Sequence, residues 1–150
     1  MKRDYPDRPI VAVGALVWRG DQVLLIRRGN PPRQGEWSLP GGAQDLGETV
    51  FEAARREVQE ETGIDVKVSA LVDVIDFMDR DAEGGIRYHY TLVDVLADYV
   101  SGDVMPGCDA DGAAWFSLDE ALARVSWAET RRVISKSHAM KTASRTGQPA

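Results

Sequence analysis

The 150-residue chain has a single cysteine, Cys108, and only two histidines. One cysteine cannot form an intrachain disulfide, which excludes a disulfide-stapled scaffold and favours a reducing, cytoplasmic compartment. Basic residues are outnumbered, with 18 lysines and arginines against 24 acidic residues and a net charge of −6. This balance argues against a nucleic-acid polymer as the partner, because proteins that bind one usually carry a basic surface.

Long hydrophobic runs are also absent. The apolar stretch over residues 10–18 stops at Arg19-Gly20-Asp21, without a small-residue cleavage pattern. It is too short to cross a bilayer and does not match an export signal, so we expect no membrane partner. With 43% hydrophobic and 28% charged residues, the composition is typical of a globular protein, and residues 1–150 are expected to form a single domain.

Apolar runs and turn residues predict the order of the secondary-structure elements. Arg19-Gly20-Asp21 separates the first two runs as the turn of a hairpin, and residues 29–42, rich in glycine and proline, are expected to form a loop. The predicted strands are 11–18, 22–28, 66–75, 88–97 and 113–116; the predicted helices are 49–62, 118–125 and 129–140; and a polar loop is predicted at 79–85. Residues 1–8 and the tail from Thr142 are expected to be irregular and flexible. The irregular alternation of strands and helices predicts a mixed α/β sandwich.

The helix over residues 49–62 has the clearest boundaries. Thr49, followed three residues later by Glu52, matches a capping box, and Gly63 supplies a stop signal.

Glu57, Glu60 and Glu61 stand at i, i+3 and i+4 on this helix and therefore share one face. A solvated acidic face is the ordinary interpretation of such a pattern. Here the same side carries the apolar residues that should pack inward: Val50, Ala53 and Ala54. Clustered, partly buried carboxylates repel one another and lose hydration unless a cation compensates. The pattern predicts a site for a hard divalent cation such as Mg²⁺.

Gly41-Gly42 precedes this helix and is either a simple tight turn or part of the same site. Glycines let the backbone approach an ion or a phosphate closely. In the second interpretation, backbone carbonyls join the metal and amides face phosphate oxygens.

The segment from Gly42 to Ile64 reads Gly-Ala-Gln-Asp-Leu-Gly-Glu-Thr-Val-Phe-Glu-Ala-Ala-Arg-Arg-Glu-Val-Gln-Glu-Glu-Thr-Gly-Ile. It resembles the Nudix box: a Gly, five residues, Glu, seven residues, Arg-Glu, an apolar residue, any residue, Glu-Glu, any residue, Gly and an apolar residue. Every specified position matches, and a looser likeness extends over residues 10–135. The resemblance implies a Nudix-type α/β/α sandwich with a mixed β-sheet.

The resemblance also implies a role for each matching position. Glu57, Glu60 and Glu61 would bind Mg²⁺, with Mn²⁺ as a substitute, and Glu57 would be, or would hold, the base that deprotonates water. Three further positions support them: Arg56 would orient a glutamate, Glu48 would brace the loop or contact an outer metal, and a carbonyl of Gly41 or Gly42 would complete the coordination.

Four residues outside the box are weaker candidates. Asp109, favoured over Asp111, either matches the place of an additional acid in some relatives or is, like Asp111, a solvated loop residue. Arg28 either reaches a substrate phosphate or is a surface arginine. Trp37 either stacks on a base or anchors its loop to the core.

The implied activity is hydrolysis of the diphosphate of a nucleoside diphosphate derivative, with ADP-ribose favoured and AMP and ribose 5-phosphate as products. A proline that marks one ADP-ribose subgroup is missing, since Asp79-Arg80-Asp81 stands in its place. The alternatives are a MutT-type nucleoside triphosphate pyrophosphohydrolase and a nucleotide-sensing domain without catalysis. Many relatives are dimers, so a homodimer with Tyr88–Tyr90 at its interface is a further expectation.

Overall fold

The computed structural model describes residues 2–31, 33–105 and 110–147, with the side chains of 110, 111 and 144–147 left out. The strands are β1 (Ile10–Arg19), β2 (Gln22–Arg28), β3 (Trp37–Ser38), β4 (Gly41–Ala43), β5 (Asp65–Arg80), β6 (Ile86–Ser101) and β7 (Ala110–Ser117). The helices are α1 (Val50–Thr62), α2 (Leu118–Arg124) and α3 (Ala128–Gly147).

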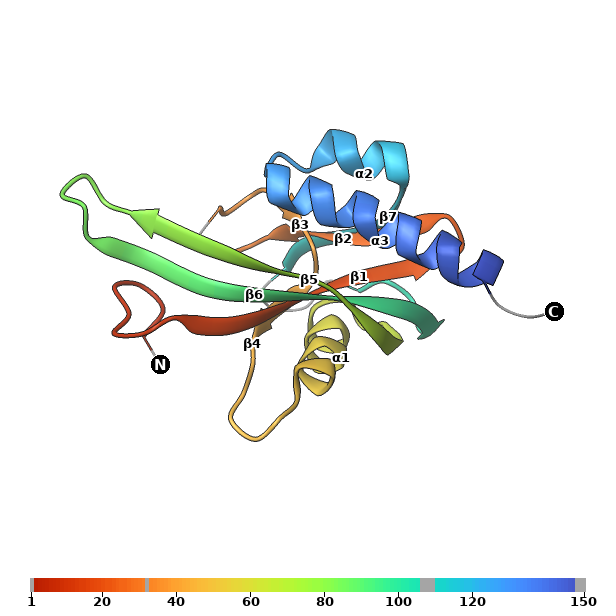
Figure 1. Ribbon diagram of the computed structural model, residues 1–150, viewed down its shortest axis with the longest axis horizontal. Helices are drawn as coiled ribbons and strands as arrows, with labels where there is room; N and C mark the ends of the chain where they lie inside the picture. The colour runs from red at the N-terminus through yellow and green to blue at the C-terminus, as the bar shows by residue number, and fades with distance from the viewer. Residues whose placement is uncertain (1, 32, 106–109, 148–150) are drawn as a thin grey trace.

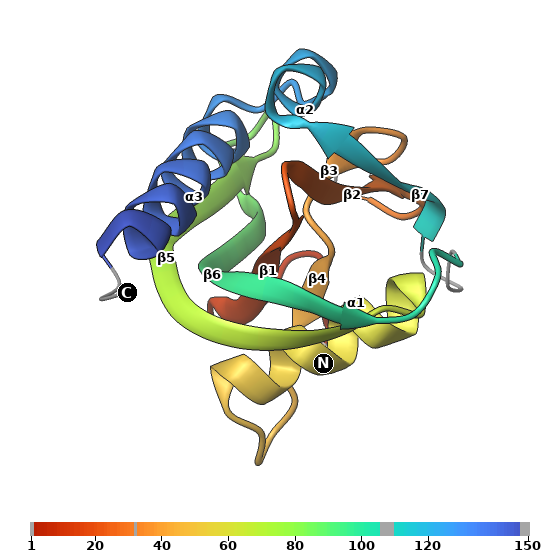
Figure 2. The same cartoon turned by 90° about the vertical axis from the view of Figure 1, so that its right-hand side faces the viewer.

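The strands form one mixed sheet of order β3-β2-β1-β6-β5, with β4 paired to β1 and β7 paired to β2. Strands β1 and β6 run parallel, and the other pairs are antiparallel. Helix α1 covers one face of the sheet, while α2 and α3 lie on the other (Figures 1 and 2). The expected α/β/α sandwich with a mixed sheet is confirmed.

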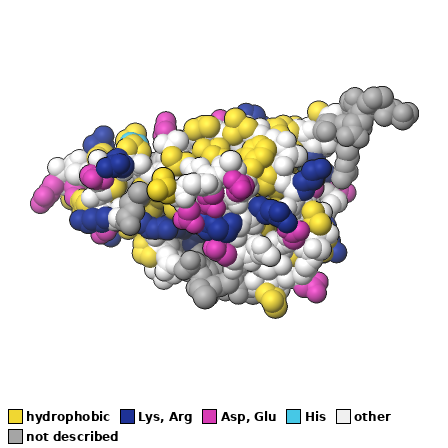
Figure 3. Space-filling model, turned by 90° about the horizontal axis from the view of Figure 1, so that it is seen from below, with side chains coloured by type: hydrophobic (Ala, Val, Ile, Leu, Met, Phe, Trp, Pro, Cys, Tyr) yellow, Lys and Arg dark blue, Asp and Glu magenta, His cyan; other side chains and the backbone are white. Residues whose placement is uncertain are grey.

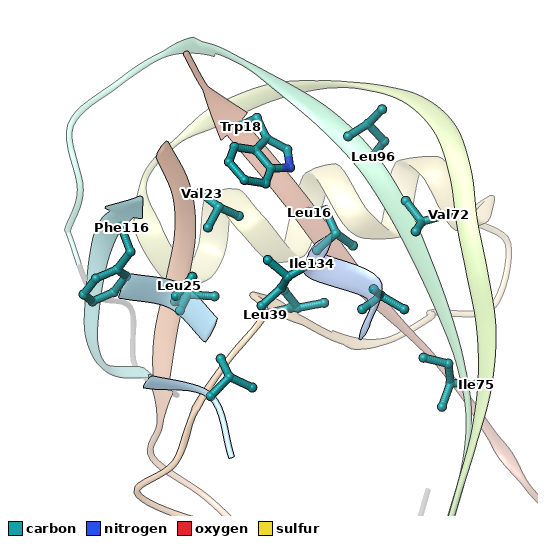
Figure 4. Close-up of a cluster of buried hydrophobic side chains, with 13 residues drawn as sticks. Leu16, Trp18, Val23, Leu25, Leu39, Val72, Ile75, Leu96, Phe116 and Ile134 are labelled. Carbon is teal, nitrogen blue, oxygen red and sulfur yellow. The ribbon is translucent and has the colours of Figure 1, made fainter. Parts of the chain in front are cut away.

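Strand β1 is the centre of the sheet, because it pairs with β2, β4 and β6. Its residues 12–18 are all buried, as expected for an apolar run covered on both faces. Leu16 and Trp18 face the α3 side, in a cluster that includes Leu96 and Ile134 (Figure 4). Ala15 and Val17 face the α1 side together with Val58. The strand therefore carries side chains into both halves of the core.

Helix α1 begins and ends where the sequence predicts. The Thr49 hydroxyl accepts from the Glu52 amide at 3.1 Å, and the Glu52 carboxylate accepts from the Thr49 amide at 2.9 Å. Gly63 closes the helix with φ of 78°, and its amide donates to the Gln59 carbonyl. The end residues thus fix which helix positions face the sheet.

The predicted loop over residues 29–42 is wrong in part, since it contains β3 and the first two residues of β4. Glycine has low strand propensity, so residues 41–43 give no strand signal of their own. Their extended conformation comes from pairing with β1, where Val13 opposes Gly42 and Gly14 opposes Gly41. The polar loop predicted at 79–85 is also shorter, because Asp79 and Arg80 belong to β5.

The prediction that the chain is irregular from Thr142 is wrong for residues 142–147, which continue α3. Lys141 explains part of this extension, since it is only 7% exposed and its ammonium lies 5.1 Å from the Trp18 ring centroid. A long lysine side chain packs its aliphatic part on an aromatic ring although it is polar in the sequence. Residues 148–150 lie outside the described part of the chain.

Tyr88 and Tyr90 are each 7% exposed and pack with Ile10 and Ala12 in the chain's own core. They are not available as an exposed interface, so that basis for a homodimer is wrong. Among the described residues, no helix is long and apolar enough to span a membrane.

A buried hydrogen bond joins β1 to α3. The Trp18 indole N–H donates to the Ser137 hydroxyl at 3.0 Å, and this hydroxyl donates to the Ile134 carbonyl at 2.8 Å. Ser137→Ala leaves the indole N–H buried without an acceptor, which should lower the free energy of unfolding by about 1–3 kcal/mol. Urea denaturation measures this change. Ser135→Ala, at an exposed position of the same helix, is the control, and equal effects of the two substitutions would contradict the assignment.

Candidate active site

The glycines of β4 lie directly against two glutamates of α1. The Gly41 amide donates to the Glu61 carboxylate at 2.7 Å, and Glu61 is only 6% exposed. A Cβ added at Gly42 would lie 2.6 Å from the carboxyl carbon of Glu57. The Glu57 carboxylate therefore occupies the volume that a side chain at position 42 would fill, and a Cβ there would displace it.

Arg56 links the acidic residues of this region to one another. Its Nε lies 3.0 Å from one Glu48 oxygen and its Nη2 lies 2.7 Å from the other, which is a bidentate pair. Its Nη1 donates to Glu57 at 2.9 Å and to Glu60 at 3.2 Å. Nη2 also donates to the Ala43 carbonyl at 3.1 Å. One guanidinium thus connects the loop before α1, the helix itself and β4.

Glu48 contacts this loop, which agrees with the bracing alternative for its position. Its carboxylate accepts from the Asp45 amide at 2.8 Å in addition to the Arg56 guanidinium. The hydrogen bonds from Arg56, and then the one from Asp45, lower the pKa of Glu48. The carboxylate is held ionised beside the helix N-terminus.

Glu57 has a different environment, because burial raises its pKa while the hydrogen bond and charge of Arg56 oppose the rise. Glu48 and Glu57 therefore share one arginine but differ in proton affinity. A partly buried carboxylate of raised pKa is a better proton acceptor than an exposed one.

The expectation that all three helix glutamates are partly buried is wrong for Glu60, whose side chain is 59% exposed. Glu60 reaches back one turn to Arg56 instead of pointing toward β4. Within the described ranges, no three His, Cys, Asp or Glu side chains converge closely enough to hold a metal ion. Figure 3 shows acidic and basic side chains side by side on the face that carries α1.

The donor set still fits a hard divalent cation. Glu57 and Glu61 both contact the β4 glycines. Glu60 accepts a hydrogen bond from Arg56, which lies one turn earlier on α1. All of these donors are oxygens, which Mg²⁺ prefers.

A pocket opens on the side of the sheet opposite to α1. Arg28 lines it, and burial lowers the pKa of this guanidinium while the negative charge of Glu61 opposes the shift. Gly41 and Gly42 belong to the same lining. The β4 glycines therefore contact the α1 carboxylates and also border the pocket.

Trp37 lines this pocket and also packs on the core. Its ring meets Phe116 edge-on, with centroids 5.2 Å apart. The core contact agrees with the anchoring interpretation, and the remaining part of the ring faces the pocket.

The two candidate acids of the late loop are not placed. Asp109 lies outside the described residues, and Asp111 belongs to β7 with its side chain left out.

Asp94 is a pocket residue that the sequence analysis missed. It is 5% exposed on β6 and lines the pocket. Burial raises the pKa of its carboxyl to about 7, the negative charge of Asp73 adds to the rise, and Arg132 opposes it. The available signal was one aspartate within the apolar run Leu-Val-Asp-Val-Leu-Ala over residues 92–97.

A comparison with family models matches residues 8–137 to the NUDIX domain. The chain belongs to the NUDIX family.

Relatives of this NUDIX chain carry different names. An ADP-ribose pyrophosphatase of Methanocaldococcus jannaschii is 40% identical over 111 residues, which are 74% of this chain and 63% of that protein. An 8-oxo-(d)GTP phosphatase of Mycolicibacterium smegmatis is 29% identical over 138 residues, covering 83% of this chain and 40% of that protein. A MutT NUDIX hydrolase structure from Burkholderia pseudomallei superposes with a TM-score of 0.74 at 34% identity, over 87% of this chain and 98% of that one. The match thus spans less than two thirds of these two curated relatives, and their names differ in the compound acted on.

The close approach of Gly42 to Glu57 in this NUDIX chain is directly testable. Gly42→Ala forces the Glu57 carboxylate to move, and such overpacking should cost about 1–3 kcal/mol of unfolding free energy. The same substitution in a Glu57→Ala background should cost much less, because the space is then free. Urea denaturation of the four proteins gives the coupling. An equal cost of Gly42→Ala in both backgrounds would show that the two residues do not compete for space.

Proposed function

We propose that this NUDIX chain is a Mg²⁺-dependent pyrophosphohydrolase that cleaves the diphosphate of a nucleoside diphosphate derivative, with ADP-ribose as the favoured substrate. The observation that supports this most directly is that Gly41 and Gly42 lie between the α1 carboxylates and the pocket. They contact the carboxylates of Glu57 and Glu61 on one side and border the pocket on the other. A diphosphate seated at β4 would therefore have its nucleoside in the pocket and its phosphates beside the carboxylates.

Glu57, Glu60 and Glu61, together with a backbone carbonyl of Gly41 or Gly42, would hold the metal. Bound there, Mg²⁺ neutralises charge on the phosphate oxygens and lowers the pKa of bound water. Glu48 and Asp109 stay candidates for an outer ligand, and the contacts of Glu48 with Arg56 and the Asp45 amide favour a bracing role for it.

The remaining chemistry belongs to side chains. Glu57 accepts the proton of the attacking water, for which its burial and raised pKa suit it. The water oxygen bonds to one phosphorus, the bridging P–O bond breaks, and the other phosphate leaves with the bridging oxygen. Arg56 keeps the Glu57 carboxylate oriented through their 2.9 Å hydrogen bond. Arg28, at the pocket wall, donates to the phosphate oxygens.

The substrate proposal rests on the relatives. The ADP-ribose pyrophosphatase at 40% identity favours ADP-ribose, cleaved to AMP and ribose 5-phosphate. The 8-oxo-(d)GTP phosphatase supports the alternative, a MutT-type nucleoside triphosphate pyrophosphohydrolase. A nucleotide-sensing domain without turnover is the third candidate, and the complete box argues against it. In each case the partner is a small nucleotide.

The first test is a hydrolysis panel with Mg²⁺, covering ADP-ribose, other nucleotide sugars, dinucleotides and nucleoside triphosphates. Glu57→Gln should lower turnover roughly a hundredfold or more, because it removes a metal ligand and the proton acceptor. Release of AMP and ribose 5-phosphate, absent in the variant, supports the proposal. Cleavage of another compound changes the substrate only. Near-wild-type turnover by Glu57→Gln would reject the role of Glu57, and nucleotide binding without any cleavage would favour the sensor.

Arg28→Ala tests the phosphate contact. If Arg28 binds phosphate equally in the ground and transition states, its loss should raise KM about tenfold or more with a smaller change in kcat. Steady-state kinetics on the best substrate of the panel measures both constants. Arg27→Ala changes the adjacent, exposed arginine on the same strand and is the matched control. An unchanged KM for Arg28→Ala would leave this arginine without a phosphate role.

A further inference from the structure

The Asp94 carboxyl is a buried acid in the pocket that hydrolysis does not use. It lies beside Gly14 of β1, its register partner in the sheet, where a Cβ would collide with one of its oxygens. Leu96, two residues further on the same strand, belongs to the cluster on the α3 side, whereas Val95 packs with Ala53 and Ala54 of α1. Because strand side chains alternate, Asp94 faces α3 and points away from the α1 carboxylates.

The Asp94 side chain is only 5% exposed and lines the pocket. Burying a carboxyl is costly, and N–H donors of a ligand would offset that cost. The missing Cβ at Gly14 leaves the carboxyl room beside the strand. The lining of the pocket includes both residues.

The walls near Asp94 are aromatic. Phe77, Tyr90 and Trp127 line the same pocket, and the rings of Phe77 and Trp127 meet edge-on with centroids 5.5 Å apart. Flat apolar walls with a few polar groups are typical of sites for planar heterocycles. Such a pocket, with one carboxyl on its sheet side, fits a nucleobase that carries N–H donors.

We propose that Asp94 binds the hydrogen-bonding edge of the substrate's nucleobase and determines which bases the pocket accepts. This inference rests on the proposed function, since it assigns the nucleoside end of the same substrate. Guanine presents two adjacent N–H donors, which an ionised carboxylate accepts. Adenine presents one donor next to one acceptor, which a protonated carboxyl matches.

Both forms of Asp94 are available near neutral pH, since its pKa is raised to about 7. The charged groups that face it are Asp73 of β5 and Arg132 of α3, and Asp73 is itself held by Arg132 at 2.8 Å and Lys136 at 3.4 Å. The other charged residues of the pocket are Arg3, Arg28, Arg33 and Glu36. The protonated form fits adenine compounds such as ADP-ribose, and the ionised form fits guanine compounds.

The test is equilibrium binding of AMP and GMP, measured by calorimetry at pH 6 and pH 8. Titration of the phosphate, and of protein groups that contact both nucleotides equally, changes both affinities by the same factor. These effects therefore cancel in the ratio of the two affinities. For the wild type, the ratio of GMP to AMP affinity should rise several-fold from pH 6 to pH 8. This comparison needs neither a variant nor turnover, so a failure to detect hydrolysis does not affect it.

Asp94→Asn replaces the titratable carboxyl with an amide, which presents an N–H donor and a carbonyl acceptor at every pH. At pH 8 it should shift the ratio toward AMP by at least about tenfold relative to the wild type, and the ratio should no longer depend on pH. Asp98→Asn, an exposed position of the same strand, should behave as the wild type. An affinity ratio that is independent of pH in the wild type and unchanged by Asp94→Asn would overturn the proposal, as would the absence of binding by either nucleotide.

Discussion

The close approach of β4 to α1 is the constraint on which the rest of the site depends. Gly41 and Gly42 are held to β1 by strand pairing, and this brings their backbone against Glu61 and Glu57. A side chain at position 42 would occupy the volume of the Glu57 carboxylate. A side chain at position 41 would instead meet the backbone of Val13, so Gly41 permits the close pairing of β4 with β1 and Gly42 leaves room for Glu57. The capped start of α1 at Thr49 sets the rotation of the helix that makes this contact.

Gathering carboxylates has an electrostatic cost, and Arg56 offsets part of it. Its guanidinium contacts Glu48, Glu57 and Glu60, and the contacts with Glu48 and Glu57 raise the pKa of Arg56. The Glu61 carboxylate accepts from the Gly41 amide. Hydrogen bonds from Arg56 and the Asp45 amide lower the pKa of Glu48, whereas burial raises that of Glu57, although the two share the same cation. Acids that lie side by side therefore differ in proton affinity.

The sequence predicted the parts of this protein whose signals are local. The capping box at Thr49, the stop at Gly63 and the helix between them follow from neighbouring residues. The Nudix box adds a second pattern that is contiguous in the sequence. Where long-range contacts decide, the prediction was wrong: β4 is extended only because β1 pairs with it, and the helix wheel could not show that Glu60 bends back to Arg56. The end of α3 was missed because Lys141 looks polar in the sequence, whereas it packs on the Trp18 ring.

The same distinction between local and long-range contacts separates the carboxylate group from the pocket. Apart from Asp109, the metal-binding candidates come from a single contiguous segment, residues 41–61, which spans β4 and α1 up to Glu61. The pocket is assembled from β1, β6, the chain around β3 and the start of α3, as its lining residues Gly14, Asp94, Trp37 and Trp127 show. The β4 glycines border this pocket and also contact Glu57 and Glu61. The pocket and the carboxylates are therefore built from different parts of the chain and meet at β4.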